Sequence, residues 1–423
     1  MSTDTRAGAE TGPESSVLPE DAVDPRLLVR ERGLAGYWEL FRRRVRGGEL
    51  GALPVIIGLL VIWTIFYLQE PRFLSAQNLT NLVLQIVAIG TISVGIVLVL
   101  LLGEIDLSVG QLSGLAAAVM AVLNVQHGVP GWLAILAGLA TGVGIGALQG
   151  FWVTRFRIPA FVVTLAGLLA WLGALLLVLG QTGTVNLSDK SITGLANTFF
   201  VPLDAWLLAL IVIAVYAGQK LWDRRKRSAA GLPVVPLRLV VTRIVVLAVG
   251  ALATAAVLAA GRGLPLALVI FIGLVAGVDL LIKRTRFGRH ILAVGGNAEA
   301  ARRAGIKVDN VPLLVFTITS TLAAAGGILA GSRQFAVSQS SGGSDILLNS
   351  IAAAVIGGTS LFGGRGSAYS ALLGMLVIGS IANGMDLLGV ESSTKFMVTG
   401  GVLLLAATVD AVSRRGRQAA GRA

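Results

Sequence analysis

Apolar residues occur in twelve runs that are separated by short polar segments. Most runs approach the length of about 20 residues that a helix needs to cross the hydrocarbon core of a bilayer. The pattern predicts an all-α polytopic membrane protein with about 10–12 transmembrane helices, and the short, small-residue-rich run at 346–361 leaves the number open. The runs fall at about 52–68, 79–102, 107–124, 132–153, 160–180, 203–219, 239–260, 264–282, 311–329, 346–361, 368–388 and 395–412.

Polar segments divide the chain into a membrane domain and two tails. We expect residues 51–412 to form the transmembrane domain, with a basic cytoplasmic insert at 220–243. Residues 1–50 are polar and basic, which predicts a disordered cytoplasmic tail, and residues 413–423 form a basic cytoplasmic tail. No basic start followed by an apolar stretch and a cleavage site opens the chain, so we expect the first apolar run to be retained.

The distribution of basic residues predicts the orientation of the helices. Of the 34 Lys and Arg residues, 29 fall in the tails and loops of one side and five on the other. Because cytoplasmic loops carry the excess of Lys and Arg, both termini are expected in the cytoplasm of a bacterial inner membrane. The net charge of +12 sits in short clusters between apolar runs. A nucleic-acid partner is therefore excluded, since it requires a contiguous basic face on a soluble surface.

Composition excludes several classes of chemistry. Only 13% of the residues are charged, about half the share in soluble proteins, so an ordinary soluble enzyme is excluded. The chain has no cysteine and only two histidines, so we expect no metal site and no catalytic residue. No lysine follows a glycine, and the phosphate cradle that ends in Gly-Lys-Ser/Thr is therefore missing. We expect no cofactor and no nucleotide hydrolysis on this chain.

An acidic break interrupts the apolar pattern at 103–110. It contains Glu104, Asp106 and Ser108, and charge at this depth costs a few kcal/mol unless it faces a cavity or a protein partner. Irregular backbone in a membrane is tolerated only where protein or water surrounds it, so we expect these three residues to border the translocation path. Two alternatives stay open: Asp106 or Ser108 caps the next helix, and Glu104 forms a structural ion pair.

A second break at 357–367 joins two apolar runs through glycines and one arginine. Together the breaks predict broken helices, with 357–367 as the counterpart of the acidic loop in an internally repeated transporter. Thr359 and Ser360 in this break, and Asn81 and Gln85 in the second run, are further candidates for the path. Hydrogen bonds between helices are an equally good use of the same side chains.

Glycines recur every fourth residue in the fourth apolar run. This spacing puts Gly138, Gly142, Gly146 and Gly150 on one stripe of a helix. Small residues at this spacing let membrane helices approach closely, so we expect a packing face inside the chain rather than a contact between subunits.

The polar segment 286–310 contains a short helix with its own start and stop signals. Asn297 is a suitable N-cap, Glu299 lies near the positive end, and Arg302 lies near the negative end. Gly305 can adopt the left-handed stop. A helix of about two turns is too short to be stable alone. We expect it to be a docking element that includes Ala300 and Ala301, and an ordinary connecting loop is the alternative.

Five motifs carry a resemblance to a known family. From about residue 70 to 412, the chain resembles the permease subunits of the monosaccharide ATP-binding-cassette importers for ribose, xylose and arabinose. It is similar to D-xylose permeases in Glu104, where many relatives have glycine, and in the basic insert at 220–243. The motifs are Phe73-Leu74-Ser75 to Asn78-Leu79, Glu104 to Gly110, Pro159 to Gly167, Phe287-Gly288-Arg289 through Gly295-Gly296-Asn297 to Gly305-Ile306, and Ile356 to Leu361.

The resemblance implies function and partners. A permease homodimer would work with a separate ATP-binding subunit, which holds ATP and Mg, and with an extracytoplasmic sugar-binding protein. The segment from Glu299 to Gly305 would be the coupling loop that contacts the ATPase. The substrate would be a monosaccharide, with D-xylose or a related pentose expected first.

Two other function classes remain open on the residues alone. An ion-coupled secondary sugar transporter would use Glu104 or Asp106 as its proton carrier. A structural or scaffolding membrane protein would need neither. The capped helix in 286–310 favours the importer, because a secondary carrier has no use for an ATPase docking element.

Overall fold

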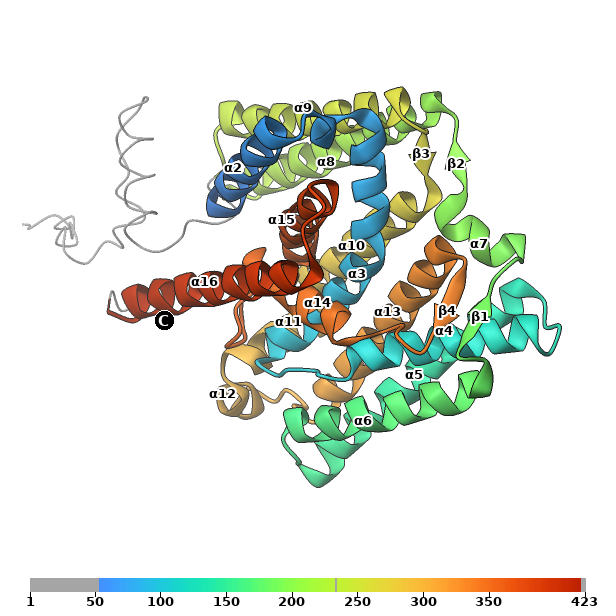
Figure 1. Ribbon diagram of the computed structural model, residues 1–423. Helices are drawn as coiled ribbons and strands as arrows, with labels where there is room; N and C mark the ends of the chain where they lie inside the picture. The colour runs from blue at the N-terminus through green and yellow to red at the C-terminus, as the bar shows by residue number, and fades with distance from the viewer. Residues whose placement is uncertain (1–52, 233, 420–423) are drawn as a thin grey trace, which may run out of the picture. The chain divides into compact units, whose positions relative to one another are not determined.

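The computed structural model describes residues 53–232 and 234–419. The chain divides into a large unit, 51–412, and a second unit formed by 1–50 and 413–423. The tail predicted at 1–50 lies outside the described residues. The tail predicted at 413–423 is described to residue 419, where it continues the last helix. The large unit consists mainly of helices (Figure 1).

Twelve apolar helices correspond to the twelve predicted runs, and the all-α polytopic fold class is confirmed. Eight are long and apolar enough to cross a membrane, and α2, α4, α14 and the apolar part of α16 are shorter. The helices are α2 (Leu53–Gln69), α3 (Ala76–Leu102), α4 (Val109–Val125), α5 (Gly131–Phe156), α6 (Ala160–Leu179), α8 (Pro202–Ala229), α9 (Leu237–Ala260), α10 (Leu266–Arg284), α13 (Asn310–Gln334), α14 (Ser344–Ile356), α15 (Ala368–Leu387) and α16 (Ser392–Ala419).

Short helices and strands lie in the loops at the two ends of the helix bundle. At one end, here the α7 end, two antiparallel pairs join distant loops: β1 with β4 and β2 with β3. At the opposite end, here the α12 end, helices α11 and α12 follow α10. The short elements are η2 (Pro71–Leu74), η3 (Gly180–Thr182), β1 (Thr184–Asn186), α7 (Lys190–Asn197), β2 (Phe199–Phe200), β3 (Leu264–Pro265), α11 (Arg286–Gly296), α12 (Ala298–Arg303) and β4 (Ala336–Ser338).

Asp189 fixes α7 to the loop between α4 and α5. Its carboxylate accepts hydrogen bonds from the Ser191 N–H at 2.7 Å, the Asn124 amide at 3.1 Å and the Gly131 N–H at 3.2 Å. Burial tends to raise the pKa of Asp189, but these hydrogen bonds outweigh it and hold the pKa below its usual value. The α7 end is thus closed by side-chain as well as strand contacts.

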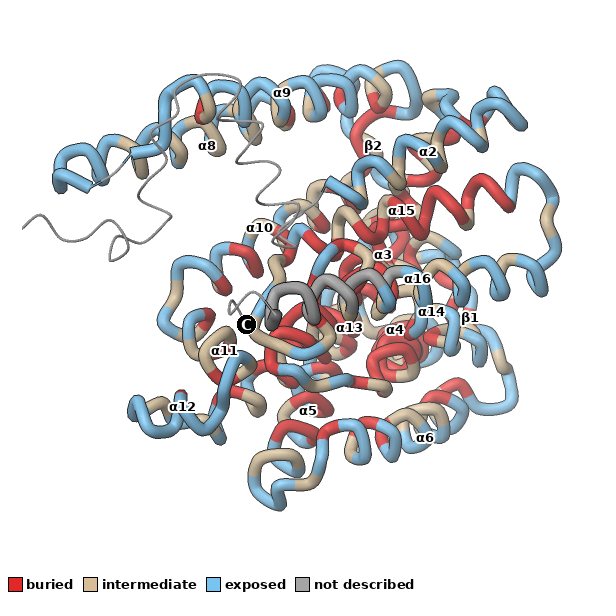
Figure 2. Tube along the Cα trace, turned by 90° about the vertical axis from the view of Figure 1, so that its left-hand side faces the viewer, coloured by how far each residue is buried: buried red, intermediate tan, exposed pale blue. Residues whose placement is uncertain are grey.

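Helix α13 lies at the centre of the fold, against α3, α4 and α5 (Figures 1 and 2). The predicted glycine stripe of α5 faces it. A Cβ at Gly146 would lie 2.6 Å from the Phe316 carbonyl oxygen, and one at Gly142 would lie 2.7 Å from the Ser320 carbonyl oxygen. At Gly150 the nearest atom is the α carbon of Leu313. The backbone of α5 therefore contacts the backbone and small side chains of α13, and the contact leaves no room for a side chain on these glycines.

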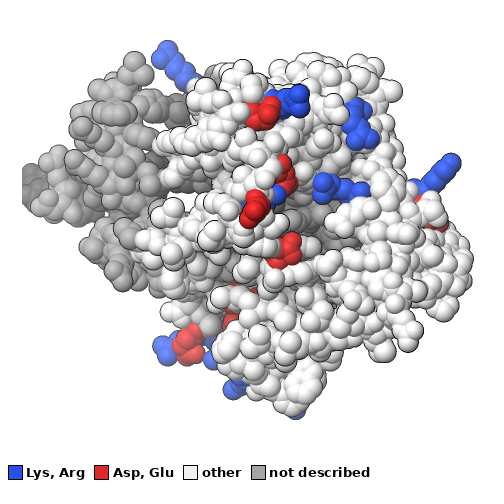
Figure 3. Space-filling model, viewed as in Figure 1, with Lys and Arg blue, Asp and Glu red and all other residues white. Residues whose placement is uncertain are grey.

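Helices α8 and α9 form a hairpin that is exposed along most of its length (Figure 2). The predicted insert at 220–243 is mostly helical, because α8 continues to Ala229 and α9 begins at Leu237. Asp223 of α8 pairs with Arg284 of α10 at 2.9 Å. The space-filling view shows a broad surface with few charges, as expected for helices that face lipid (Figure 3).

Helices α4 and α14 are broken helices. Their 17 and 13 residues correspond to about 26 and 20 Å at 1.5 Å per residue, less than the hydrocarbon core requires. Each begins inside the bundle, where Gly342 packs against the Gly110 backbone so closely that a Cβ would overlap the Gly110 carbonyl. The predicted run at 346–361 is therefore a half-length helix preceded by an irregular segment, 339–343, that enters the bundle from the α7 end.

The α5–α13 contact generates a stability prediction. We expect Gly146→Ala to lower the unfolding free energy by about 1–3 kcal/mol, because the added Cβ overpacks the α13 backbone. Gly144→Ala on the same helix is the matched control, since nothing lies within 4 Å of a Cβ there. Thermal unfolding of the detergent-solubilised protein measures the difference. Equal melting temperatures for both variants would contradict the packing account.

Candidate functional site

Helix α11 lies against the body at the α12 end. Thr285 caps it by accepting a hydrogen bond from the Gly288 N–H at 3.0 Å. Ile291 and Val294 are buried and anchor one face of the helix. This anchoring positions the following helix, α12, on the surface.

Helix α12 has the caps that the sequence predicts. The Asn297 side chain accepts from the Ala300 N–H at 2.9 Å, and Gly305 has a φ of 83° where the helix ends. Glu299 pairs with Arg302 at 3.3 Å and with Arg303 at 3.1 Å. All of these charged side chains are exposed, so α12 presents a mixed-charge surface.

Ala301 does not belong to that surface. The sequence predicts a docking element that includes Ala300 and Ala301. In the structure only 5% of Ala301 is exposed, because it packs into the protein's own core. Ala298, Ala300 and Ala304 remain exposed beside the charged side chains of the helix and form the face that is free to contact a partner.

Three segments meet backbone to backbone beside α11, and we call this contact the glycine junction: Leu101–Gly103, Gly295 and Gly363–Gly364. The Gly364 N–H donates to the Leu101 carbonyl at 2.9 Å. A Cβ at Gly295 would overlap the same carbonyl, and one at Gly363 would lie 2.5 Å from the Gly295 carbonyl oxygen. The end of α3 and the second break thus contact the end of α11 directly, and Gly103 of the first break contacts Gly363 of the second.

Glu104 follows the end of α3. Gly103 has a φ of 79°, and the Glu104 N–H donates to the Val99 carbonyl at 3.2 Å, which closes the helix in a Schellman-type stop. The Glu104 side chain is half-buried and forms no ion pair with any residue in 53–232 or 234–419. The structural ion pair is therefore absent from the described chain.

Asp106 and Ser108 form a buried hydrogen-bonded turn before α4. Asp106 Oδ1 accepts from the Ser108 N–H at 2.8 Å and from its hydroxyl at 2.7 Å, and the Ser108 hydroxyl accepts from the Gln149 amide of α5 at 2.7 Å. Ser108 holds the N-cap position, but its side chain bonds no helix N–H. The expected side-chain cap is wrong, because both side chains are engaged with each other and with α5.

Thr359 and Ser360 shape the second break. The Ser360 hydroxyl accepts from the Phe362 N–H at 3.2 Å, and the Ser360 N–H donates to the Arg365 carbonyl at 3.0 Å. Thr359 is buried beside Gly366, where a Cβ would lie 2.9 Å from its hydroxyl oxygen. Both side chains belong to a turn that folds against the end of α3.

Asn81 and Gln85 lie farther along α3, toward the α7 end. Gln85 accepts from the Asn383 amide of α15 at 3.4 Å, and Asn383 also bonds Asn78 at 2.7 Å. This cluster fits the helix–helix interpretation. Asn81 is half-buried on the same helix. The seven path candidates are thus separated along the bundle, and the structure does not gather them around one cavity.

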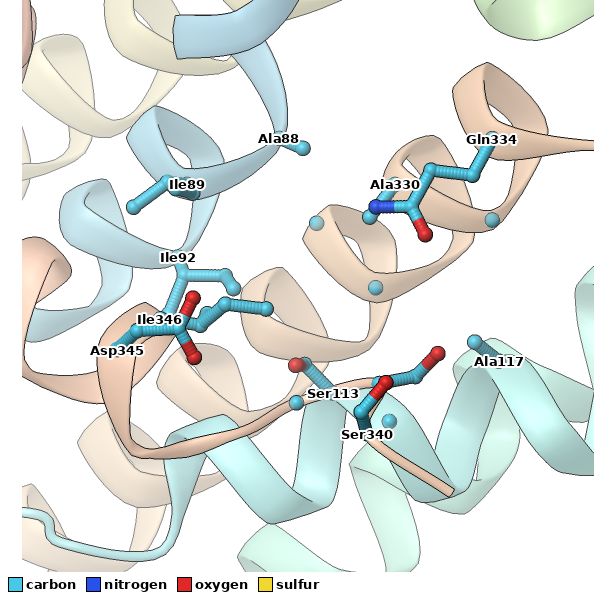
Figure 4. A pocket seen from close by; sticks show the side chains of 16 residues that line it. Ala88, Ile89, Ile92, Ser113, Ala117, Ala330, Gln334, Ser340, Asp345 and Ile346 are labelled. Atoms are coloured by element: carbon cyan, nitrogen blue, oxygen red, sulfur yellow. The ribbon is translucent and has the colours of Figure 1, made fainter. Parts of the chain in front are cut away.

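A cavity of about 270 Å³ lies elsewhere, between α3, α4, α13 and the segment 339–343 (Figure 4). Ser113, Gln334, Ser340, Ser341 and Asp345 supply most of its polar side chains. None of these residues is among the path candidates that the sequence suggests. The available signal was the polar stretch from 333 to 345 between two apolar runs, which resembles an ordinary surface loop when only the sequence is read.

Among the described residues, no group of three His, Asp or Glu side chains is placed to hold a metal ion. Asp106 is buried and bonded to Ser108, and Glu104, two residues before it, is half-buried.

The family model for the permease component of branched-chain amino acid transport systems matches residues 78–407. This range covers both breaks, the glycine junction, α12 and the cavity.

Curated relatives are similar over most of the chain. The xylose transport system permease protein XylH of Escherichia coli K12 is 35% identical over 86% of this chain and 91% of its own length. XylH of Haemophilus influenzae is 34% identical over 88% of this chain and 99% of its own length. The ribose import permease protein RbsC of Bacillus subtilis is 31% identical over 86% of this chain and 94% of its own length. No solved structure matches the chain. The resemblance drawn from the motifs is confirmed, and the chain belongs to this family of membrane transport permeases.

Proposed function

We propose that the chain is the permease subunit of an ATP-driven importer for a monosaccharide, D-xylose or a related pentose. The names of the relatives support the sugar, and the xylose permeases match at higher identity than the ribose permeases. The chain would form the path through the membrane. ATP and Mg would be bound by a separate ATP-binding subunit, and a sugar-binding protein would deliver the substrate from outside.

The α12 end is proposed to face the cytoplasm. The loops at this end, together with both tails, carry 29 of the 34 basic residues. The α7 end would then receive the sugar-binding protein. This orientation puts the exposed, charged surface of α12 where an ATP-binding subunit can reach it.

The glycine junction is the observation that carries the coupling proposal. Helix α12 can open or close the translocation path only if its movement is transmitted to the membrane-spanning helices. Here Gly295 at the end of α11 contacts the end of α3 and the loop before α15 without intervening side chains. Rigid, close-packed contacts transmit displacement because protein interiors deform little. A movement of α12 would therefore shift both helix breaks together.

A homodimer of the permease is part of the proposal and rests on the family resemblance. Exposed apolar side chains of α2 and α16, among them Leu60, Leu68 and Phe396, leave surface for lipid or a second copy.

An ion-coupled carrier is the second candidate, and one observation favours it. Asp106 is fully buried, and its Oδ2 atom has no hydrogen-bond partner among the described residues. A buried carboxylate without a partner is costly unless it binds a proton. The driving force for uptake separates the two candidates.

Energy dependence is the first test. We expect uptake of labelled D-xylose by the reconstituted complex to require ATP and to persist when a protonophore collapses the proton gradient. Liposomes with enclosed ATP allow both conditions to be set independently. Loss of uptake on uncoupling at constant ATP would support the ion-coupled carrier instead.

The charged surface of α12 gives the second test. We expect Glu299→Lys to reduce ATP-driven uptake at least about tenfold, because it replaces two ion pairs with a cluster of cations at the positive end of the helix. Membrane insertion should be unchanged. Asp309→Lys is the control, since Asp309 is exposed in the same segment and forms no ion pair with a described residue. Normal uptake by Glu299→Lys would exclude the docking role.

The glycine junction gives the third test. We expect Gly295→Ala to abolish uptake while the ATP-binding subunit stays bound, because the new Cβ separates α11 from the Leu101 carbonyl. Gly296→Ala should be active, since nothing lies within 4 Å of a Cβ there, and neither glycine has a positive φ. Uptake, subunit copurification and sugar-stimulated ATP hydrolysis are measured together. Full activity of Gly295→Ala would contradict transmission through the junction.

A further inference from the structure

The cavity beside α13 contains two polar side chains without a hydrogen-bond partner in the described part of the chain. Gln334 ends α13 and Asp345 lies in the first turn of α14, and their side chains approach the cavity from opposite sides (Figure 4). Asp345 forms no ion pair within 53–232 or 234–419. Both side chains are exposed to the space they border, so they are available to a polar ligand.

We propose that this cavity binds one monosaccharide molecule during its passage through the permease. The inference rests on the proposed function and names the place where the sugar is held. It assigns the contacts to Gln334, Asp345 and the serines of the segment 339–343, rather than to the seven candidates drawn from the sequence.

The chemistry of the lining fits a sugar. Each sugar hydroxyl both donates and accepts a hydrogen bond, and burying it without partners costs free energy. Asp345 accepts, Gln334 does both, and the hydroxyls of Ser340 and Ser341 add further partners. Ile89, Ile92 and Ile346 line the remaining wall and suit the C–H faces of a pyranose ring.

The size of the cavity fits one ring. An apolar cavity of about 150 Å³ accepts benzene, and the volume here is about 270 Å³. The additional space accommodates the hydroxyl groups of a pentose or hexose.

Glycines hold the cavity open between the helices and fix its inner wall. A Cβ at Gly326 would lie 2.7 Å from the Ala88 carbonyl oxygen, and Cβ atoms at Gly114 and Gly327 would overlap the backbones of Ser341 and Ser113. The segment 339–343 therefore rests directly on α4, and its two serines, Ser340 and Ser341, line the cavity. Larger residues at these glycines would displace the wall.

The cavity also lies at a suitable depth. It extends from Gln334 at the α7 end of α13 to the beginning of the broken helix α14. Under the proposed orientation a sugar released outside would reach Gln334 first and Asp345 next. The small number of polar partners predicts weak binding, which allows the sugar to leave toward the cytoplasm.

The absence of cysteine from the chain makes a direct test possible. Ser340→Cys places a single thiol at the cavity, and Ser393→Cys places one on exposed surface at the start of α16. We expect saturating D-xylose to slow alkylation of Ser340→Cys by N-ethylmaleimide at least about threefold in membrane vesicles. Maltose, a disaccharide that is too large for the cavity, should have no effect, and Ser393→Cys should react equally with either sugar. Equal rates at Ser340→Cys with D-xylose and maltose would overturn the proposal.

Uptake kinetics provide a second readout. We expect Gln334→Ala and Asp345→Asn to raise the apparent KM for D-xylose about fivefold to tenfold, as the loss of a hydrogen bond or two implies. Gln339→Ala is the matched control, because Gln339 is exposed in the same segment and does not line the cavity. If the KM for D-xylose is unchanged in both variants while the wild-type complex transports the sugar, the cavity is excluded as the sugar site and the proposed function stands. If the wild-type complex does not transport D-xylose, the proposed function itself is excluded.

Discussion

The close approach of α13 to three neighbouring helices is the constraint on which the rest of the structure depends. Between helices in lipid there is no hydrophobic driving force, so association relies on van der Waals packing and hydrogen bonds. Glycines supply that packing on every side of α13: the stripe of α5, Gly95 of α3, and Gly326 and Gly327 of α13 itself. The Thr319 hydroxyl adds a hydrogen bond to the Gly95 carbonyl at 2.9 Å. The high glycine content is thus explained by close packing between helices and not by backbone flexibility.

This packing makes broken helices possible. Irregular backbone inside a bilayer must be shielded from lipid, and the segments before α4 and α14 are shielded because α13 and α5 hold the bundle together around them. Hydrogen bonds between Asp106 and Ser108 stabilise the turn before α4, and Gln149 donates a further hydrogen bond to Ser108. The segment before α14 is stabilised differently, by contact of Gly342 with the α4 backbone. The segments before α4 and α14 are therefore stabilised by different contacts.

Several features could be predicted from the sequence because they depend on local or periodic signals. The helix positions follow from apolar runs, and α12 follows from Asn297, Glu299 and Gly305, which act within two turns. The direction of Ala301 could not be predicted, because the contact that buries it comes from elsewhere in the chain. For the same reason the sequence put Glu104, Asp106, Thr359 and Asn81 into one path. Asn81 lies toward the other end of α3 from the two breaks, and Gln334 and Asp345 border a common cavity only in the folded chain.

The sequence by itself determined that this is a polytopic permease whose chain lacks its own nucleotide-hydrolysing motif, since apolar length, charge distribution and short motifs are readable residue by residue. Only the tertiary structure decided which polar groups meet. It joined Leu101, Gly295 and Gly364 in one junction and set a cavity beside α13. The physical reason is that such contacts join residues distant in sequence through backbones in van der Waals contact, and no local pattern encodes which glycine will face which carbonyl.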